Sequence, residues 1–155
     1  MTVPEFEMEF QCPKGVVKDG RMTLQDVRTL VYRCEIDSVP VALLRPDWAA
    51  GKEQYFNGKS IYGGEYDEGE AYLYFCRASL EYLERTGRNP DIIHLHEWQT
   101  AAAAMLYWDH FQQNTRLDRP KITLTIHNAA NSGEMPQDKF AITGFHGSIF
   151  RWDHG

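Results

Sequence analysis

Two small polar groups in this chain carry residue types that ligand binding and chemistry need. His96 and Glu97 directly follow one run of apolar, β-favouring residues, and His127 and Asn128 directly follow a second such run. Imidazole, carboxylate and amide groups that meet in a cleft are candidates for binding or catalysis. Whether the two groups meet depends on the elements that carry them.

The elements expected to position these groups are a strand, a helix and a second strand. Residues 91–96 and 121–126 are rich in Ile, Leu and Thr and predict strands, and residues 98–112 predict a helix. A βαβ unit of this kind places its two strands side by side and parallel. Helical spacing puts these residues on one face of the helix: Ala101, Ala104 or Met105, Trp108 and Phe111.

Both polar groups therefore fall at the carboxyl ends of neighbouring parallel strands, where ligands of open α/β sheets bind. The amino terminus of the helix lies at the same edge and favours negative charge. We expect His96 and His127 to approach each other there, with room for a polar or anionic ligand. Hydrogen-bonded histidines with a purely structural role remain an alternative at this point.

Composition places the chain among ordinary globular proteins. It has 155 residues, enough for one domain, and 43% of them are hydrophobic and 25% charged. A formal charge of −6 without a Lys/Arg cluster argues against nucleic acid or an anionic membrane as a partner. No apolar run approaches the length of a membrane span.

The cysteines and the first residues bear on the compartment. Cys12, Cys34 and Cys76 are odd in number and lack metal-type spacing, so we expect free thiols in a reducing compartment. The opening MTVPEFEMEF has neither a signal-peptide core nor a transit-peptide composition. We expect either no targeting segment or a chain that starts downstream of one.

Residues 1–60 predict a region of short strands, turns and a hairpin. Period-two alternation predicts a half-exposed strand over residues 5–10, and residues 13–15 and 18–21 carry turn signals. Two β-rich runs, residues 30–36 and 39–44, flank Asp37-Ser38 and predict a hairpin. The irregular loop that follows brings three aromatic residues expected to pack in the core: Trp48, Tyr55 and Phe56.

Residues 61–128 predict the core of the fold. The Gly-rich stretch at 62–66 lacks the glycine spacing and the Lys of a phosphate loop. A helix follows, with Asp67 as its cap and Glu70 placed as in a capping box, and it ends at Gly87. Its predicted buried face consists of Tyr72, Phe75, Cys76, Ser79 and Leu83.

Residues 129–155 predict a polar loop and tail, with a short helix near 137–142. The whole chain is thus expected to be a single partial α/β domain with part of a parallel sheet and flanking helices. The strand and Gly-rich turn that open a doubly wound sheet are not visible. The chain has the pattern expected of the middle of a larger α/β domain.

Four segments together resemble the starch and glycogen synthases, retaining glucosyltransferases with two Rossmann-like lobes. They are Val39-Pro40-Val41 with its aromatic loop, YGGEYD running into YFCRA, PDIIHLHEWQT at 90–100, and TIHN at 125–128. They appear in the family's order across most of residues 35–130. The continuations HNAANSGE and PQDKFAITG are similar to plant and algal starch synthases of the fourth and fifth classes.

The resemblance implies part of the N-terminal lobe of a GT-B glycosyltransferase. Such an enzyme transfers glucose from ADP-glucose to the non-reducing end of an α-1,4-glucan, without a metal or other cofactor, and in plants it works in the plastid. The family's motifs assign catalytic roles to His127, beside the transferred sugar, and to Glu97, near the sugar or the acceptor. They assign substrate binding to Asn128, His96, Trp98 and Gln99. We expect a sugar to lie between Glu97 and His127.

Departures from the family pattern limit this expectation. Glu97 stands where Asp is commoner, which moves the carboxylate by one methylene. The family's Lys-x-Gly-Gly nucleotide loop and its second lobe are not found in these 155 residues. We therefore expect the isolated chain to have no measurable transferase activity.

Two alternatives stay open on the sequence alone. One is a metal-dependent hydrolase, because His94 and His96 would lie on one strand face, with Glu97 and His127 as further ligands. The other is a non-catalytic module that binds glucan or scaffolds a partner. A truncated sheet would leave an exposed edge for such a role.

Overall fold

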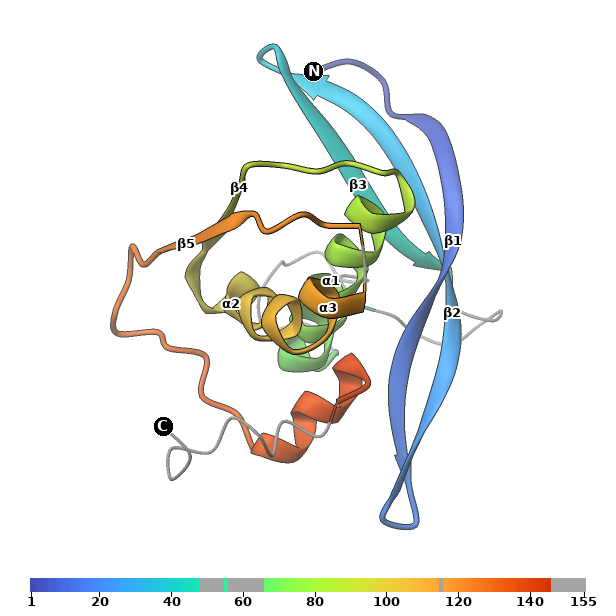
Figure 1. The fold of residues 1–155 in the computed structure, drawn as a ribbon, viewed down its shortest axis with the longest axis vertical. Coiled ribbons are helices and arrows are strands. Elements are labelled where there is room, and N and C mark those ends of the chain that lie inside the picture. The colour runs from blue at the N-terminus through green and yellow to red at the C-terminus, as the bar shows by residue number, and fades with distance from the viewer. Residues whose placement is uncertain (48–54, 56–65, 115, 146–155) are drawn as a thin grey trace.

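The computed structural model describes residues 1–47, 55, 66–114 and 116–145. A long, twisted antiparallel sheet lies along one side of the molecule, and the helices with a small parallel sheet lie beside it (Figure 1). The predictions for Trp48, Phe56 and residues 62–65 fall outside the described residues. No described helix has the length and apolar character that a membrane crossing requires.

The antiparallel sheet consists of β1 (Glu5–Lys18), β2 (Arg21–Ile36) and β3 (Val39–Asp47) in that order. The hairpin predicted between β2 and β3 is confirmed, with Ile36 paired to Val39. Asp37 and Ser38 have φ angles of 49° and 64°, the left-handed conformation that two-residue hairpin turns require.

The turn predicted at residues 13–15 is wrong, because these residues lie inside β1 and pair with residues 24–26 of β2. β1 is an edge strand, where the missing N–H of Pro13 is tolerated. Gly15 lies against the backbone of Ala141, and a Cβ at this position would collide with the Ala141 carbonyl oxygen. The glycine therefore marks a close approach of two backbones and not a turn.

The first helix, α1 (Glu68–Arg85), begins as predicted. The Asp67 carboxylate accepts a hydrogen bond from the Glu70 backbone N–H at 3.1 Å. The return bond of a capping box is replaced, because the Glu70 carboxylate binds the ammonium of Lys14 and the hydroxyl of Tyr55. Gly87, with φ of 65°, follows the helix end as expected.

The predicted buried face of α1 is found in part. Cys76 is buried, Tyr72, Ser79 and Leu83 are half-buried, and the prediction is wrong for Phe75, which is 41% exposed. The helix packs against the antiparallel sheet on one side and α2 on another, so burial covers much of its circumference. The buried residues are Ala71, Leu73, Tyr74, Cys76, Arg77, Ala78, Leu80, Glu81 and Tyr82.

The predicted βαβ unit is present. β4 (Ile92–His96) pairs in parallel with β5 (Lys121–Thr125), and His96 lies opposite Thr125. Between them run α2 (Glu97–Leu106), the π-helical turn η1 (Tyr107–Phe111) and the short α3 (Gln112–Asn114).

The buried face of this connection differs from the prediction, since Trp108 is 52% exposed whereas Ala103, Leu106, Tyr107 and Phe111 are buried. Ala residues fill four consecutive positions, 101–104, in the middle of α2, so no polar face marked the register.

A short helix expected near residues 137–142 is found as the 3₁₀ helix η2 (Gln137–Thr143), which packs on β1 and α1.

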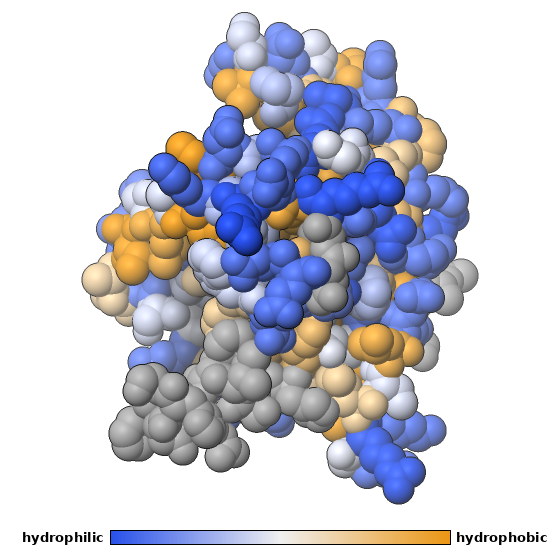
Figure 2. All heavy atoms as spheres, viewed as in Figure 1, coloured by the Kyte–Doolittle hydropathy of each residue, from blue (hydrophilic) through white to orange (hydrophobic). Residues whose placement is uncertain are grey.

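On the opposite part of the molecule, the two parallel strands leave apolar side chains uncovered by other described residues. Ile92, Leu124 and Ile126 are 57%, 46% and 62% exposed. Figure 2 shows apolar surface gathered over this region. Parallel strands are ordinarily covered on both faces, so this surface is unusual.

Candidate functional site

The ends of β4 and β5 bring together the two polar groups that the sequence singled out. His96 Nδ1 lies 3.4 Å from His127 Nε2, although the two residues are 31 positions apart. The expected approach of these histidines is therefore found at the carboxyl edge of the parallel pair. Both side chains are exposed, so the edge is open to a ligand.

The two imidazole rings meet edge to edge. Their planes differ by only 6° and their centroids lie 5.7 Å apart. The facing nitrogens are only 3.4 Å apart, so the centroids are farther apart by roughly the width of one ring. This difference arises when the two nitrogens lie on the line between the centroids, so the rings share a plane and do not overlap face to face. One nitrogen donates a hydrogen bond and the other accepts it, which holds both side chains in one orientation.

Glu97 links the two strand ends through its side chain. Its Oε1 accepts a hydrogen bond from the backbone N–H of His127 at 2.5 Å. Glu97 also has φ of 62°, in the left-handed region that non-glycine residues rarely adopt. Because Oε1 contacts this N–H directly, the Glu97 carboxylate is held against the backbone of the segment that follows β5.

Thr100 fixes the junction between β4 and α2. Its hydroxyl accepts a hydrogen bond from the backbone N–H of His96 and donates one to the carbonyl oxygen of the same residue, both at 2.7 Å. The His96 side chain makes no capping hydrogen bond to α2. The Thr100 hydroxyl, from the first turn of the helix, instead pairs with the backbone N–H and carbonyl of His96. The first turn of α2 is thereby held with its N–H groups toward the strand ends.

The remaining candidate residues lie next to this pair. The Asn128 side-chain oxygen accepts from the Ala130 N–H at 3.1 Å, which shapes the turn after β5. Trp98 Nε1 and Gln99 Oε1 are buried and have no hydrogen-bond partner among the described residues. Buried polar atoms in this state are uncommon and are often satisfied by water or a ligand.

The metal-site alternative finds no support in the geometry. His94 does lie on the same strand face as His96, with ring centroids 4.2 Å apart. However, His94 Nε2 is hydrogen-bonded to the Thr125 hydroxyl at 2.7 Å. Within the described part of the chain, no three His, Cys, Asp or Glu residues are arranged to hold a metal ion.

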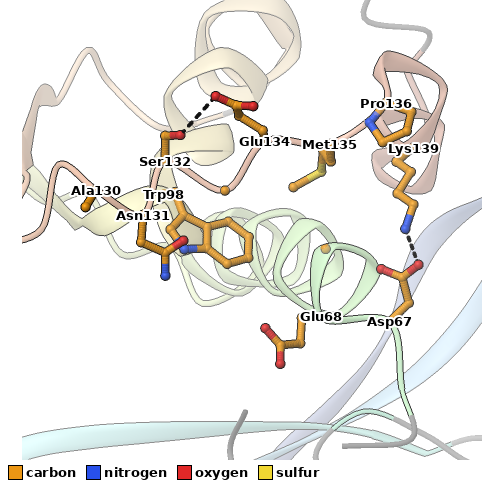
Figure 3. A pocket seen from close by; sticks show the side chains of 12 residues that line it. Asp67, Glu68, Trp98, Ala130, Asn131, Ser132, Glu134, Met135, Pro136 and Lys139 are labelled. Carbon is orange, nitrogen blue, oxygen red and sulfur yellow. Dashed lines mark hydrogen bonds and ion pairs between the residues drawn. The ribbon is translucent and has the colours of Figure 1, made fainter. Parts of the chain in front are cut away.

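A cleft with a volume of about 570 Å³ opens beside Trp98 (Figure 3). Its walls come from the start of α1 and from the segment after β5, which sequence reasoning had treated only as a polar loop. The polar run directly after the second strand was the feature that could have identified it. The cleft is lined by Asp67, Glu68, Gly69, Trp98, Ala130, Asn131, Ser132, Gly133, Glu134, Met135, Pro136 and Lys139.

An ion pair spans the far end of this cleft. The Lys139 ammonium donates to the Asp67 carboxylate, which also caps α1. This hydrogen bond holds the pKa of the Asp67 carboxyl below its usual range. The pair joins the segment after β5 to the start of α1, so the cleft is closed at that end by a charged contact.

Comparison with known proteins identifies relatives for nearly the whole chain. Residues 4–154 match the family model described as the starch synthase catalytic domain. A glycogen synthase of Protochlamydia amoebophila is 41% identical over 97 residues, which are 63% of this chain and 19% of that protein. "Probable starch synthase 4, chloroplastic/amyloplastic" of Arabidopsis thaliana is 39% identical over 109 residues, 70% of this chain and 10% of that protein.

A solved structure agrees with this similarity. The catalytic domain of starch synthase IV from Arabidopsis thaliana, bound to ADP and acarbose, superposes with a TM-score of 0.74 at 28% identity. The match covers 96% of this chain and 29% of the other. The chain thus spans between about a tenth and a third of the length of these relatives.

Proposed function

Because this chain belongs to the starch synthase catalytic domain family, we propose that it serves as part of a glucosyltransferase. Its α/β fold is part of a GT-B lobe. The proposed reaction moves glucose from ADP-glucose to the non-reducing end of an α-1,4-glucan. The observation that carries the proposal is the Glu97–His127 hydrogen bond at the carboxyl edge of β4 and β5.

The proposed chemistry assigns a distinct task to each part of this edge. The bond between the glucosyl C1 and the diphosphate breaks, positive charge gathers on the sugar, and negative charge gathers on the leaving group. The acceptor 4-hydroxyl forms the new bond to C1 and gives its proton to the departing diphosphate. His127 and Asn128 lie beside the sugar, while the first-turn N–H groups of α2 favour negative charge.

Glu97 takes a positioning task in this proposal. Its Oε1 holds the His127 backbone and through it the imidazole that faces the sugar. The side chain of Glu, one methylene longer than that of Asp, reaches from the left-handed backbone position to the His127 N–H just after β5. A displacement of about 1 Å at such a site can lower a rate on the order of 10²-fold, so we expect loss of the Glu97–His127 hydrogen bond to slow the transfer.

The substrates and the compartment belong to the proposal as well. The related starch synthase IV domain binds ADP and acarbose, which supports a nucleotide sugar and a glucan as substrates here. The Arabidopsis relative is named as chloroplastic/amyloplastic whereas other relatives are bacterial, and we propose the plastid. Since these 155 residues correspond to 29% of the starch synthase IV chain, we propose that they transfer no glucose by themselves.

A chimera tests the proposed function. Residues 4–154 would replace the matching segment of the Arabidopsis starch synthase 4 protein, and transfer of labelled glucose from ADP-glucose to glucan would be measured. We expect activity in the chimera and a loss of roughly 10²- to 10³-fold with His127→Ala. His94→Ala, on the same sheet edge, is the matched control and should change the rate little. Full activity with His127→Ala would refute the proposed role.

The second candidate is a module that binds glucan without catalysis. The polar cleft beside Trp98 favours it, because the described residues that line it include the amide of Asn131, the hydroxyl of Ser132 and the carboxylate of Glu134. Retention of the 155-residue chain on insoluble glucan, and its loss with Trp98→Ala, would support binding. Retention of the variant equal to that of the original chain would count against a site at the strand ends.

A further inference from the structure

We propose that His96 is a positioning residue that acts through His127, by fixing both the direction of its imidazole and the nitrogen that carries the proton. This inference rests on the proposed function, since it concerns the group that faces the sugar in the same reaction. His127 Nε2 lies 3.4 Å from His96 Nδ1. The other ring nitrogen of His127, Nδ1, makes no hydrogen bond to a described residue, so it is the atom left to meet the sugar.

Two contacts hold His127, one at its backbone and one at its ring. The backbone N–H donates to Glu97 Oε1, which fixes where the side chain begins but not its rotation. The ring is exposed, and among the described residues its hydrogen bond is to His96. His96 therefore selects the rotamer of His127, a task that the Glu97 contact cannot perform.

The backbone of His96 is fixed by the sheet and by α2. His96 is the last residue of β4 and pairs with Thr125 of β5. Its N–H and its carbonyl both bond to the Thr100 hydroxyl at 2.7 Å. The ring of His96 thus projects from a held position, and it can orient the ring of His127, which lies two residues beyond the end of β5.

The contact also decides which nitrogen of His127 carries the proton. A neutral imidazole has one N–H donor and one acceptor nitrogen, so the pair can form in two ways. If His127 Nε2–H donates to His96 Nδ1, both rings are in the Nε2–H tautomer, which is the commoner form of a neutral histidine in water. The reverse bond requires the rarer Nδ1–H tautomer in both rings. The proton of His127 therefore lies on Nε2, and Nδ1 keeps its lone pair.

A neutral His127 with a lone pair on Nδ1 suits the proposed transfer. Positive charge gathers on the sugar as its bond to the diphosphate breaks, and a cationic imidazole beside it would oppose this change. The Nδ1 lone pair can accept a hydrogen bond from a hydroxyl group of the sugar, which holds the sugar without adding positive charge. His96 thus sets the hydrogen-bonding character of the group that meets the substrate.

Nitrogen-15 magnetic resonance of the 155-residue chain tests the pairing without a substrate. Protonated and unprotonated imidazole nitrogens differ widely in chemical shift, and the His127 signals are assigned by their loss in His127→Ala. At about pH 9, above the range in which histidine ordinarily titrates, we expect a protonated Nε2 and an unprotonated Nδ1. In His96→Leu the two shifts should move toward each other, because the two tautomers then exchange. A protonated Nδ1 in the original chain, or unchanged shifts in His96→Leu, would overturn the inference.

A conservative variant separates the hydrogen bond from the bulk of the ring. The amide of His96→Asn lies near the position of the lost Nδ1 and can accept a hydrogen bond from His127 Nε2. We expect His96→Asn to restore the single tautomer of His127. His94→Ala should leave it unchanged, since His94 bonds to the Thr125 hydroxyl. Equal effects of the Leu and Asn substitutions at His96 would rule out the hydrogen bond as the cause.

Kinetics of the chimera test whether His96 acts through His127. We expect His96→Leu to lower kcat by between about 10- and 10²-fold, and His96→Asn to recover most of this loss. In a chimera that already carries His127→Ala, His96→Leu should cause no further loss, because the group that it positions is gone. An equal further loss in that background would show that His96 acts by itself.

The two proposals can fail separately. If the chimera transfers no glucose, the proposed reaction is wrong, and the nitrogen shifts still decide whether His96 fixes the tautomer of His127. If the chimera is active and His96→Leu has the original kcat, the reaction stands and the positioning role is refuted.

Discussion

The carboxylate of Glu97 accepts a hydrogen bond from the backbone N–H of His127 at 2.5 Å, across the ends of two parallel strands. The sheet pairs these strands only as far as His96 and Thr125. Beyond that point the side chain of Glu97 continues the connection. It does so from a left-handed backbone position, which ordinarily costs about 1 kcal/mol or more.

The first prediction concerns this connection. Glu97→Ala removes the bond and keeps the unfavourable φ, so we expect a loss of about 1–2 kcal/mol in the free energy of unfolding measured with urea. Glu97→Gly removes the same bond but relieves the backbone, and should lose less. The backbone amide signal of His127 should move in both variants. An unmoved signal in Glu97→Ala would show that the bond does not form in solution.

Local chemistry explains which parts of the fold could be predicted from the sequence. The Asp37-Ser38 hairpin, the Asp67 cap and the end of α1 at Gly87 depend on a few adjacent residues, and all three are found. The βαβ unit depends on β-branched runs separated by a helical length, which the sequence also displays. Its topology then places His96 and His127 together without further information.

Features set by distant contacts could not be predicted. Gly15 resembled a turn residue, because the backbone of Ala141 that requires it lies 126 positions away. The register of α2 was ambiguous, since its alanines carry no polar face. The cleft beside Trp98 combines α1 with the segment after β5, and no local pattern links the two.

The second prediction concerns Arg77, a buried cation. Its guanidinium donates to the Glu81 carboxylate at 2.7 and 3.0 Å and to the Thr143 carbonyl at 3.0 Å, and it lies 5.3 Å from the ring centres of Phe111 and Phe145. We expect Arg77→Met to lower the free energy of unfolding by about 3 kcal/mol in urea, because Glu81 keeps a buried charge with only Arg85 as an ion-pair partner among the described residues.

A double variant and a surface control test the cause. Replacing both Arg77 and Glu81 with Met removes the unpaired charge, so the double variant should be more stable than Arg77→Met alone. Arg28, whose ion pairs with Glu9 and Asp47 are exposed, should be replaceable by Gln with little change. A double variant less stable than the single one would point to lost packing instead.

The third prediction concerns the cysteines, which are free as the sequence predicted and which the fold buries. Burial raises the pKa of the Cys12 and Cys76 thiols to about 12. Since the thiolate is the reactive form, we expect these two thiols to resist Ellman's reagent at pH 8 in the folded chain. In urea all three, including Cys34, should react. Rapid labelling of Cys12 without urea would contradict the packing of β1 on α1, and rapid labelling of Cys76 would contradict the packing of α1 on α2.

The fourth prediction concerns pH and His110. Burial, and secondarily the nearby charge of Arg77, lowers the pKa of His110 below its usual value. The unfolded chain therefore takes up a proton first as the pH falls. The contribution of His110 to the free energy of unfolding is complete above about pH 6.5. It decreases as the pH falls below that value, and it stops decreasing once the pH is under the lowered pKa. Urea unfolding measured between pH 7.5 and 5.5 should show this decline.

Replacing His110 removes the effect if the cause is right. The ring centroids of His110 and Phe145 lie 5.1 Å apart. The charged groups that influence the pKa of His110 are Arg77, Glu81 and Asp109. In His110→Gln the decline across this range should shrink, whereas His94→Gln, an exposed histidine, should retain it. The Asp67–Lys139 pair acts in a separate window, because a carboxyl with a lowered pKa loses its contribution only below about pH 4. An equal decline in both variants would therefore assign the pH dependence to a group other than His110.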